Sequence, residues 1–306
     1  MKGNKILIVG SSNTDMVIKT LNFPAPGETI LGGRFLMNAG GKGANQAVAA
    51  ARLGGLVTFI GKIGDDIFGK QAVQQLKDEG INVDFVSIDP ENPSGVALIT
   101  VDRRGENSIV VAPGSNGTLS AADFDKAIDL LAESEFVLMQ LEIPIPTVEH
   151  IAQLASLAHK KVILNPAPGA KLSDELLNKL YLITPNETEA ELLTGIKVTD
   201  EPSALRAATF LHEKGVEIVI ITMGSAGAFL LANGKHEMIS APRVEAIDTT
   251  AAGDTFNGAL VVALSEGQTI QEAIAFANEA AAISVTRIGA QSSVPFRKEI
   301  LNQIKL

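Results

Sequence analysis

One segment of the sequence, Asp248 to Gly258, combines small residues with a carboxylate at the start of a helical pattern. Small residues let backbone N–H groups approach an anion, and the helix N-terminus adds the positive end of its dipole. Asp254 lies just beyond those donors, where it could accept a proton from a hydroxyl while charge develops on a phosphate. An acidic residue in a first helical turn can also be only stabilising, so both interpretations stay open at this point.

A second segment, Ala39 to Ala47, is rich in glycine and leads into a helix expected over Ala44–Leu53. Glycines permit a ligand to approach the backbone closely, and Lys42 and Asn45 would add polar contacts. The alternative is a tight turn into an alanine-rich helix. Three glycines in four positions are more than such a turn needs, so a binding role and a tight turn both stay open at this point.

A third pair of residues, Asn186 and Glu189, follows a predicted strand. Their spacing is that of an N-cap residue and the third helical residue, so a capping box explains them without any function. At the carboxyl end of a strand, however, an amide and a carboxylate could also face phosphates and Mg²⁺-bound water. Spacing alone favours the capping box.

Two other predicted strand ends carry residues that could bind a ligand. Thr222 to Gly227 could wrap a nucleotide through backbone contacts, or form a glycine-rich hairpin turn. Asn13 and Asp15 follow the first strand, Ile6–Gly10, and could bind sugar hydroxyls or form a solvated turn. Gly64 to Gln71 nearly fits the P-loop pattern, but it lacks the final Ser or Thr and places two aspartates in the phosphate cradle.

Composition excludes several classes of protein. The chain has no cysteine, which removes disulfides, thiol nucleophiles and cysteine metal sites. Its net charge is −10, it has no tryptophan, and no basic stripe is visible, so we expect no nucleic-acid partner. No apolar run is long enough to span a membrane, and no export signal is visible, so we expect a cytoplasmic protein.

The elements that must position these residues alternate regularly from about residue 130. Buried strands are predicted at Phe136–Gln140, Lys161–Asn165, Tyr181–Thr184 and Val216–Thr222, with helices beginning near Pro144, Ser173, Asn186 and Pro202. Two more helices are predicted, one over Gly253–Ser265 and one from a capping box of Thr269 and Glu272 to about Val285. This alternation predicts an α/β fold with a doubly wound, mostly parallel sheet flanked by helices, which binds ligands at the carboxyl ends of its strands.

The first third of the chain differs from this pattern. Strands are expected at Asp15–Lys19, Thr29–Met37, Val96–Asp102 and Asn107–Ala112, joined by turn-rich connections. We interpret them as a small inserted β-sheet, with strands in about 13–38 and 94–113, within a single α/β domain spanning residues 1–306. Short strands cannot easily bury two faces, so the exposed face would pair with a second copy.

Taken together and in this order, these segments resemble the ribokinase family of carbohydrate kinases. Gly40 to Ala47 matches the family's first signature and Asp248 to Gly258 matches its second, more specific one. The pair Asn186 and Glu189 and the segment Thr222 to Gly227 match two further family elements. The likeness covers essentially the whole chain. It implies ATP-dependent phosphorylation of D-ribose at its 5-hydroxyl, with Mg²⁺ and a monovalent cation, and a homodimer in which the inserted sheet is a lid over the sugar.

The resemblance also implies roles for matched positions. Asp254 would be the catalytic base, with the anion hole formed by Ala251, Ala252 and Gly253. Ribose would be held by Asn13, Asp15, Gly41, Lys42, Gly43, Asn45, Glu142 and Asp254. ATP would be held by Asn186, Glu189, Thr222, Gly224, Ser225, Gly227, Gly253 and Asn278, of which Asn278 is the weakest match. K⁺ would be held by Asp248 and Ser293 with backbone carbonyls of Thr250, Ser284, Arg287 and Gly289.

Two alternatives remain. A sister kinase would act on deoxyribose, another sugar or a nucleoside. The polar set Asn13, Asp15, Lys42 and Glu142 favours a free sugar, because a nucleoside pocket should be more apolar or aromatic. A non-catalytic regulator that binds a sugar or nucleotide would have no need of Asp254 or of a complete anion hole.

Overall fold

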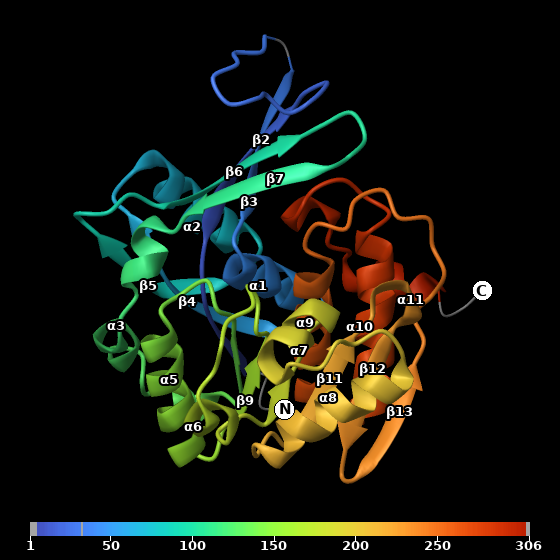
Figure 1. Cartoon of the computed structure of the whole chain (residues 1–306). Coiled ribbons are helices and arrows are strands. Elements are labelled where there is room, and N and C mark those ends of the chain that lie inside the picture. The colour runs from blue at the N-terminus through green and yellow to red at the C-terminus, as the bar shows by residue number, and fades with distance from the viewer. Residues whose placement is uncertain (1–4, 32, 304–306) are drawn as a thin grey trace.

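A nine-stranded central sheet forms the body of the molecule. The computed structural model describes residues 5–31 and 33–303. The strand order is β13-β12-β11-β10-β9-β8-β1-β4-β5, and only β12 and β13 run antiparallel to their neighbours (Figure 1). These strands are β1 Lys5–Val9, β4 Leu56–Gly64, β5 Asn82–Asp89, β8 Phe136–Met139, β9 Lys161–Leu164, β10 Leu182–Ile183, β11 Ile218–Thr222, β12 Ala228–Ala232 and β13 Lys235–Ile239. The predicted α/β fold with a mostly parallel sheet is confirmed.

Helices cover both faces of this sheet and create two hydrophobic cores. Along β1, Ile6 and Ile8 enter one core with α1, α9 and α10, while Leu7 and Val9 enter the other with α5 and α8. This alternation follows from the two-residue period of a strand. The α-helices are α1 Lys42–Arg52, α2 Ile67–Asp78, α3 Ala121–Asp125, α4 Leu130–Glu133, α5 Ile145–Leu157, α6 Asp174–Leu177, α7 Glu187–Thr194, α8 Glu201–Glu213, α9 Ala252–Ser265, α10 Ile270–Ser284 and α11 Arg297–Gln303. Among the described residues, none of the helices is long and apolar enough to cross a membrane.

A separate four-stranded sheet, which we call the lid, stands over one end of the central sheet (Figure 1). Its order is β3-β2-β6-β7, formed by β2 Asn13–Lys19, β3 Arg34–Gly40, β6 Gly95–Val101 and β7 Asn107–Ala112. Asp15 pairs with Asn38 and Ala97, and Met16 pairs with Met37 and Leu98. Asp15 and Met16 therefore belong to opposite faces of the lid.

The predicted strand Thr29–Met37 is wrong in its bounds, because β3 begins at Arg34 and continues to Gly40. The partner strand sets this limit: β2 ends at Lys19, which is paired with Arg34. Gly33 then turns the chain with φ of 128°, a conformation that favours glycine. Residues 29–31 are consequently outside any strand, and residue 32 lies outside the described residues.

The other boundaries differ by a few residues, and the predicted caps are present. Helix α1 begins at Lys42 rather than Ala44, and the predicted strand Tyr181–Thr184 is reduced to Leu182–Ile183. Ser173 caps α6, and both capping boxes, at α7 and α10, are formed. In the rejected P-loop segment, Asp66 accepts a hydrogen bond from Gly69 N–H at 2.8 Å and caps α2. That aspartate therefore has a structural explanation.

Candidate active site

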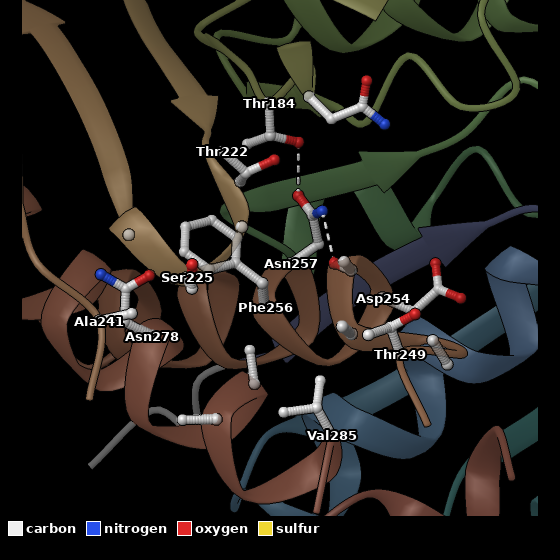
Figure 2. A pocket seen from close by; sticks show the side chains of 18 of the residues that line it. Thr184, Thr222, Ser225, Ala241, Thr249, Asp254, Phe256, Asn257, Asn278 and Val285 are labelled. Carbon is white, nitrogen blue, oxygen red and sulfur yellow. Dashed lines mark hydrogen bonds between the residues drawn. The ribbon is translucent and has the colours of Figure 1, made fainter. Parts of the chain in front are cut away.

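A cleft of about 980 Å³ opens at the carboxyl ends of β9, β10 and β11. Asn165, Thr184 and Thr222 stand at these three strand ends, and they line the cleft together with the first turn of α9. This is where an open parallel sheet binds ligands, and the volume suits a nucleotide-sized molecule. Figure 2 shows the hydroxyl of Thr184 directed at Asn257 of α9.

The residues predicted to bind a nucleotide are all in the lining of this cleft. They are Asn186, Glu189, Thr222, Gly224, Ser225, Gly227, Gly253 and Asn278. Gly227 has φ of 103°, and a Cβ there would lie 2.1 Å from the carbonyl oxygen of Ile239, so this glycine is also required by the fold. Asn278 donates to the same carbonyl at 3.0 Å, which ties β13 to α10 as well as facing the cleft.

The start of α9 presents unused backbone donors to the cleft. Ala251 precedes the helix in the left-handed region, with φ of 59°, which turns the chain sharply into the first turn. Among the described residues, no group accepts from the N–H of Gly253 or of Asp254, as expected for the first residues of a helix. A Cβ built on Gly253 would meet no protein atom within 4 Å. Neither backbone strain nor packing requires glycine at 253, so the space beside it is available to a ligand.

Asn257 fixes the direction of one of these donors. Its side-chain N–H donates to the carbonyl oxygen of Gly253 at 2.8 Å, and its own amide oxygen accepts from the hydroxyl of Thr184 at 2.7 Å (Figure 2). Because a trans peptide holds its C=O and N–H antiparallel, a bond to the Gly253 carbonyl also orients the N–H of Asp254. The sequence reasoning did not identify Asn257, which is an ordinary interior residue in a helical pattern.

The carboxylate of Asp254 is buried, with 6 % of the residue exposed, and it accepts from two amides. Asn45 donates to its Oδ2 and Gln46 donates to its Oδ1, each at 2.9 Å. The Oδ1 of Asn45 is buried and has no hydrogen-bond partner in the described structure. An unpaired buried acceptor is costly, so it favours a ligand hydroxyl in the space beside Asp254.

A cluster of carboxylates surrounds Lys42. Burial, followed by the charges of Glu142 and Asp254, raises the pKa of Asp15 to about 7. Burial alone would lower the pKa of Lys42, but Asp254, Glu142, Glu189 and Asp15 together raise it above its ordinary value. Residues from the lid, α1, α7 and α9 thus form one electrostatic group, although they lie far apart in the sequence.

Replacing Asp15 by asparagine should stabilise the protein at alkaline pH. Since the folded-state pKa of Asp15, about 7, exceeds its ordinary 3.8, the folded state holds a proton in this window that the unfolded state releases. Stability from this group therefore falls as pH rises from about 4 to 7. We expect the melting temperature of Asp15→Asn to exceed wild type by a few degrees at pH 8 and by less at pH 5.

Thermal unfolding at both pH values measures this difference. Asp84→Asn, at an exposed position on β5, controls for removing one surface charge. An Asp15→Asn variant less stable than wild type at pH 8 would contradict the prediction.

Glu142 lies at the N-terminus of α1. Its Oε2 accepts from the Ser11 hydroxyl at 2.6 Å and from the Lys42 backbone N–H at 3.0 Å. No spacing in the sequence could have identified Glu142, because it follows β8 without a recognisable motif. Asn13, at the start of β2, accepts from Asn116 at 2.7 Å.

The glycines before Asn45 are required by internal packing. A Cβ on Gly40 would overlap the carboxylate of Asp15, and one on Gly43 would lie 2.6 Å from the Gly10 backbone. Gly41 has φ of 89° and backs onto Ser12. Three glycines in four positions thus allow α1 and the lid to approach the end of β1 closely, whatever they contribute to binding.

Asn186 and Glu189 combine a cap with a place in the cleft. Asn186 Oδ1 accepts from Glu189 N–H at 2.8 Å, and Glu189 Oε2 accepts from Asn186 N–H at 3.0 Å. Burial raises the pKa of Glu189. The other carboxylate oxygen of Glu189 has no hydrogen-bond partner among the described residues, so it remains available to water or an ion.

Asp248 joins the loop before α9 to the loop after α10. Its Oδ1 accepts from the N–H and hydroxyl of Thr250, and its Oδ2 accepts from Gly289 N–H at 2.9 Å. Burial alone would raise the pKa of Asp248, but these hydrogen bonds outweigh it and lower that pKa below its ordinary value. Ser284 and Ser293 are fully buried, and each donates its hydroxyl to a backbone carbonyl, which leaves oxygen lone pairs free. Such oxygens suit a hard cation.

Comparison with known proteins identifies related sequences over nearly the whole chain. The model of the pfkB family of carbohydrate kinases matches residues 4–297. A ribokinase of Haemophilus influenzae is 50 % identical over 296 residues, covering 97 % of both proteins. A deoxyribokinase of Salmonella typhi is 38 % identical and covers 95 % of each. A solved structure of Arabidopsis thaliana ribokinase complexed with ribose and ATP has a TM-score of 0.93 at 33 % identity, covering 99 % of both chains.

Proposed function

Because the chain belongs to the pfkB family of carbohydrate kinases, we propose that it transfers the γ-phosphoryl group of ATP to the 5-hydroxyl of D-ribose. The chain is thus an enzyme rather than a non-catalytic binding protein. One observation carries the proposed mechanism: the buried carboxylate of Asp254 lies beside the unpaired backbone N–H groups of Gly253 and Asp254 in the first turn of α9. A proton acceptor and the N–H donors that would bind an anion then face the same space at the end of the cleft.

In this mechanism Asp254 takes the proton of the sugar hydroxyl as its oxygen bonds to the γ-phosphorus, while the bond from that phosphorus to the bridging oxygen breaks and ADP leaves. The unpaired backbone N–H groups of Gly253 and Asp254 stabilise the charge on the phosphoryl oxygens, with the direction of the second fixed by Asn257. Of the three residues predicted for the anion hole, Ala251, Ala252 and Gly253, Ala252 is the least available, because its N–H donates to the carbonyl of Thr249 at 3.2 Å. Lys42 lines the cleft and stays positively charged because of the carboxylates around it. It therefore joins the sugar side of the site to the phosphate side.

The proposed sugar-binding group is the polar set around Asp254. It comprises Asn13, Asp15, Gly41, Lys42, Gly43, Asn45, Glu142 and Asp254. The unpaired Oδ1 of Asn45 and the group of buried carboxylates support this role, because sugar hydroxyls donate hydrogen bonds to both. A molecule with many hydroxyls fits this set better than a nucleoside base does.

The proposed nucleotide group is the glycine-rich turn after β11 together with α7 and α10. Backbone approach at Gly224, where a Cβ would meet nothing within 4 Å, leaves room for the nucleotide. The free carboxylate oxygen of Glu189 could coordinate Mg²⁺ or accept a hydrogen bond from water bound to it. Mg²⁺ bound with ATP would neutralise phosphate charge.

The test is ATP consumption across ribose, deoxyribose, fructose and a nucleoside at matched concentrations with Mg²⁺ present. We expect the highest kcat/KM for ribose, and ³¹P NMR of the product should show a 5-phosphate ester. The likeness to a deoxyribokinase makes deoxyribose the most informative competitor. A higher kcat/KM for any other sugar or for the nucleoside would refute ribose specificity but not kinase activity.

We also propose that K⁺ is bound between the loop before α9 and the loop after α10. The set is Asp248, Thr250, Ser284, Arg287, Gly289 and Ser293. An ion there would stabilise the loop that precedes the anion hole. Replacing K⁺ by Na⁺ or Tris should therefore lower kcat several-fold, and Asp248→Asn should remove the difference among the three ions. Steady-state rates at constant ionic strength measure this, and equal wild-type rates in all three would exclude the requirement.

The lid is the proposed surface for a homodimer. Its outward face carries exposed apolar side chains at two-residue spacing: Ile18, Phe35, Met37, Leu98 and Val110. Exposed apolar side chains gathered on one face often mark an interaction surface, and a second copy can cover these by two-fold symmetry. Leu98→Asp should give a monomeric mass by light scattering where wild type gives a dimer. Leu157→Asp, an exposed leucine on α5, is the control, and a monomeric wild type at micromolar concentration would refute the proposal.

A further inference from the structure

Gln46 lies directly behind Asp254 and is fully buried. Its Nε2 donates to Asp254 Oδ1 at 2.9 Å and to Asn165 Oδ1 at 3.1 Å, and its Oε1 accepts from Gln140 Nε2. Both N–H hydrogens and the carbonyl of this amide are therefore in use. A glutamine with every polar group paired and no exposure has only one preferred orientation.

The hydrogen bonds of Gln46 continue into a closed path. Asn165 donates to the carbonyl of Thr184 at 3.2 Å, Thr184 donates to Asn257, and Asn257 donates to the carbonyl of Gly253. Gly253 precedes Asp254 in the chain, so the path returns to the residue where it began. Through Gln46 the path holds the carboxylate of Asp254, and through Asn257 it holds the peptide group between Gly253 and Asp254.

The polarity of this path is set by Asp254. An ionised carboxylate only accepts hydrogen bonds, so the amide of Gln46 must turn its N–H groups towards it. The Oε1 of Gln46 then faces Gln140, which must donate its side-chain N–H to it. Reversing Gln46 would place its oxygen against both the carboxylate and Asn165 Oδ1, which are acceptors.

We propose that Gln46 is a positioning residue that holds the carboxylate of Asp254 in the orientation that accepts the proton of the sugar hydroxyl. This rests on the proposed role of Asp254 as the base. Asn45 holds the other carboxylate oxygen but also lies beside the sugar space, through its unpaired Oδ1. Gln46 has no exposed atom with which to contact a substrate. Its loss should therefore reduce the chemical step and not substrate binding.

The central experiment compares Gln46→Met with Gln140→Met in the full chain. Methionine keeps the length of glutamine but has no N–H to donate. Gln46→Met should lower kcat by about 10–10²-fold, the effect expected of a carboxylate displaced by up to about 1 Å. KM for ribose and for ATP should change less than about threefold. Gln140→Met leaves both donations of Gln46 to Asp254 and Asn165 in place, so its kcat should fall by less than about threefold.

Two readouts separate positioning from a merely structural role. The acid limb of the pH dependence of kcat/KM should move to higher pH in Gln46→Met, because a carboxylate that loses a donor is protonated more easily. In an Asp254→Asn background, Gln46→Met should cost less than about twofold further in kcat, because residues that act as a unit are not additive. If Gln46→Met does not fold, Gln46→Asn, which withdraws the amide by one methylene, takes its place in every measurement.

The outcomes distinguish this inference from the function on which it rests. If Asp254→Asn loses activity while Gln46→Met keeps wild-type kcat, the positioning role is refuted and the base is not. If the two glutamine variants lose kcat equally, or if the Gln46 loss is undiminished without Asp254, the network is only structural. If Asp254→Asn itself remains active, the proposed base is wrong.

Discussion

Replacing Asp254 by asparagine should lower kcat by about 10²–10⁴-fold, the range of general-base catalysis, and should change the sugar KM much less. The variant keeps the size of the side chain and a hydrogen-bonding group. It removes the carboxylate proposed to take the proton of the attacking hydroxyl. Asn45 and Gln46 each donate an N–H to one oxygen of the carboxylate. An asparagine amide has only one oxygen, so its NH₂ group would lie against the NH₂ group of one of these neighbours unless that neighbour reorients.

The alternative explanation of Asp254, a stabilising first-turn residue, predicts a different result. Removing the carboxylate would then cost up to about 1 kcal/mol of stability, with near-normal turnover of the folded enzyme. Glu272→Gln is the matched control, because Glu272 is an exposed first-turn carboxylate of the next helix, α10. Measuring kcat and thermal unfolding on the same samples separates the two. A folded Asp254→Asn enzyme that keeps more than about a tenth of wild-type kcat falls outside the expected range.

The second large effect is expected from a single methyl group at Gly253. A Cβ there meets no protein atom within 4 Å, and the backbone does not require glycine. Gly253→Ala should therefore fold normally, with stability unchanged or slightly higher because alanine favours a helix. The methyl group would occupy the space proposed for the transferred phosphoryl group. Displacing that group by about 1 Å should lower kcat/KM by about 10²-fold.

The chain supplies a matched control at Gly117. A Cβ there would make only ordinary contacts, at 3.5 Å or more from Pro113, and the position is not in the lining of the cleft. Gly117→Ala should keep wild-type kcat/KM. Steady-state kinetics with ribose and ATP, alongside thermal unfolding, test both variants. If Gly253→Ala is fully active, no phosphoryl group approaches the first turn of α9 as closely as we propose.

The sequence predicts the regular half of this fold well, because hydrophobic runs and caps are local signals. Strands β8 to β11 and the caps at Ser173, Asn186 and Thr269 follow from neighbouring residues alone. The error at β3 arose because its limits depend on β2, a partner on the other side of an irregular loop. Strands β4 and β5 with α2 between them were not identified, since the P-loop-like glycines and aspartates obscured the helix start.

Predicting the site from sequence was limited in the same way. Motifs point to Asp254 and to the segment around Lys42, because both combine glycine or alanine with a polar residue before a helix. Glu142 was found only through a family resemblance. Gln46 and Asn257 lie inside the two matched segments, but nothing marked their side chains individually, because a polar residue inside an amphipathic helix is common. Their importance is visible only where α1 and α9 meet.

The contact between α1 and α9 also has a consequence for how the protein is made. Helix α1 ends at Arg52 and α9 begins at Ala252, yet both enter the same core with Ile6 and Ile8 of β1. At a synthesis rate of about 5–20 residues per second, α9 leaves the ribosome about 10–40 s after α1. During that interval α1 and α2 are available to this apolar side of the nascent sheet, but the cover that α9 and α10 provide is missing. We therefore expect the half-made chain to be prone to aggregation or chaperone binding, and a chain that ends before α9 to keep this apolar surface exposed.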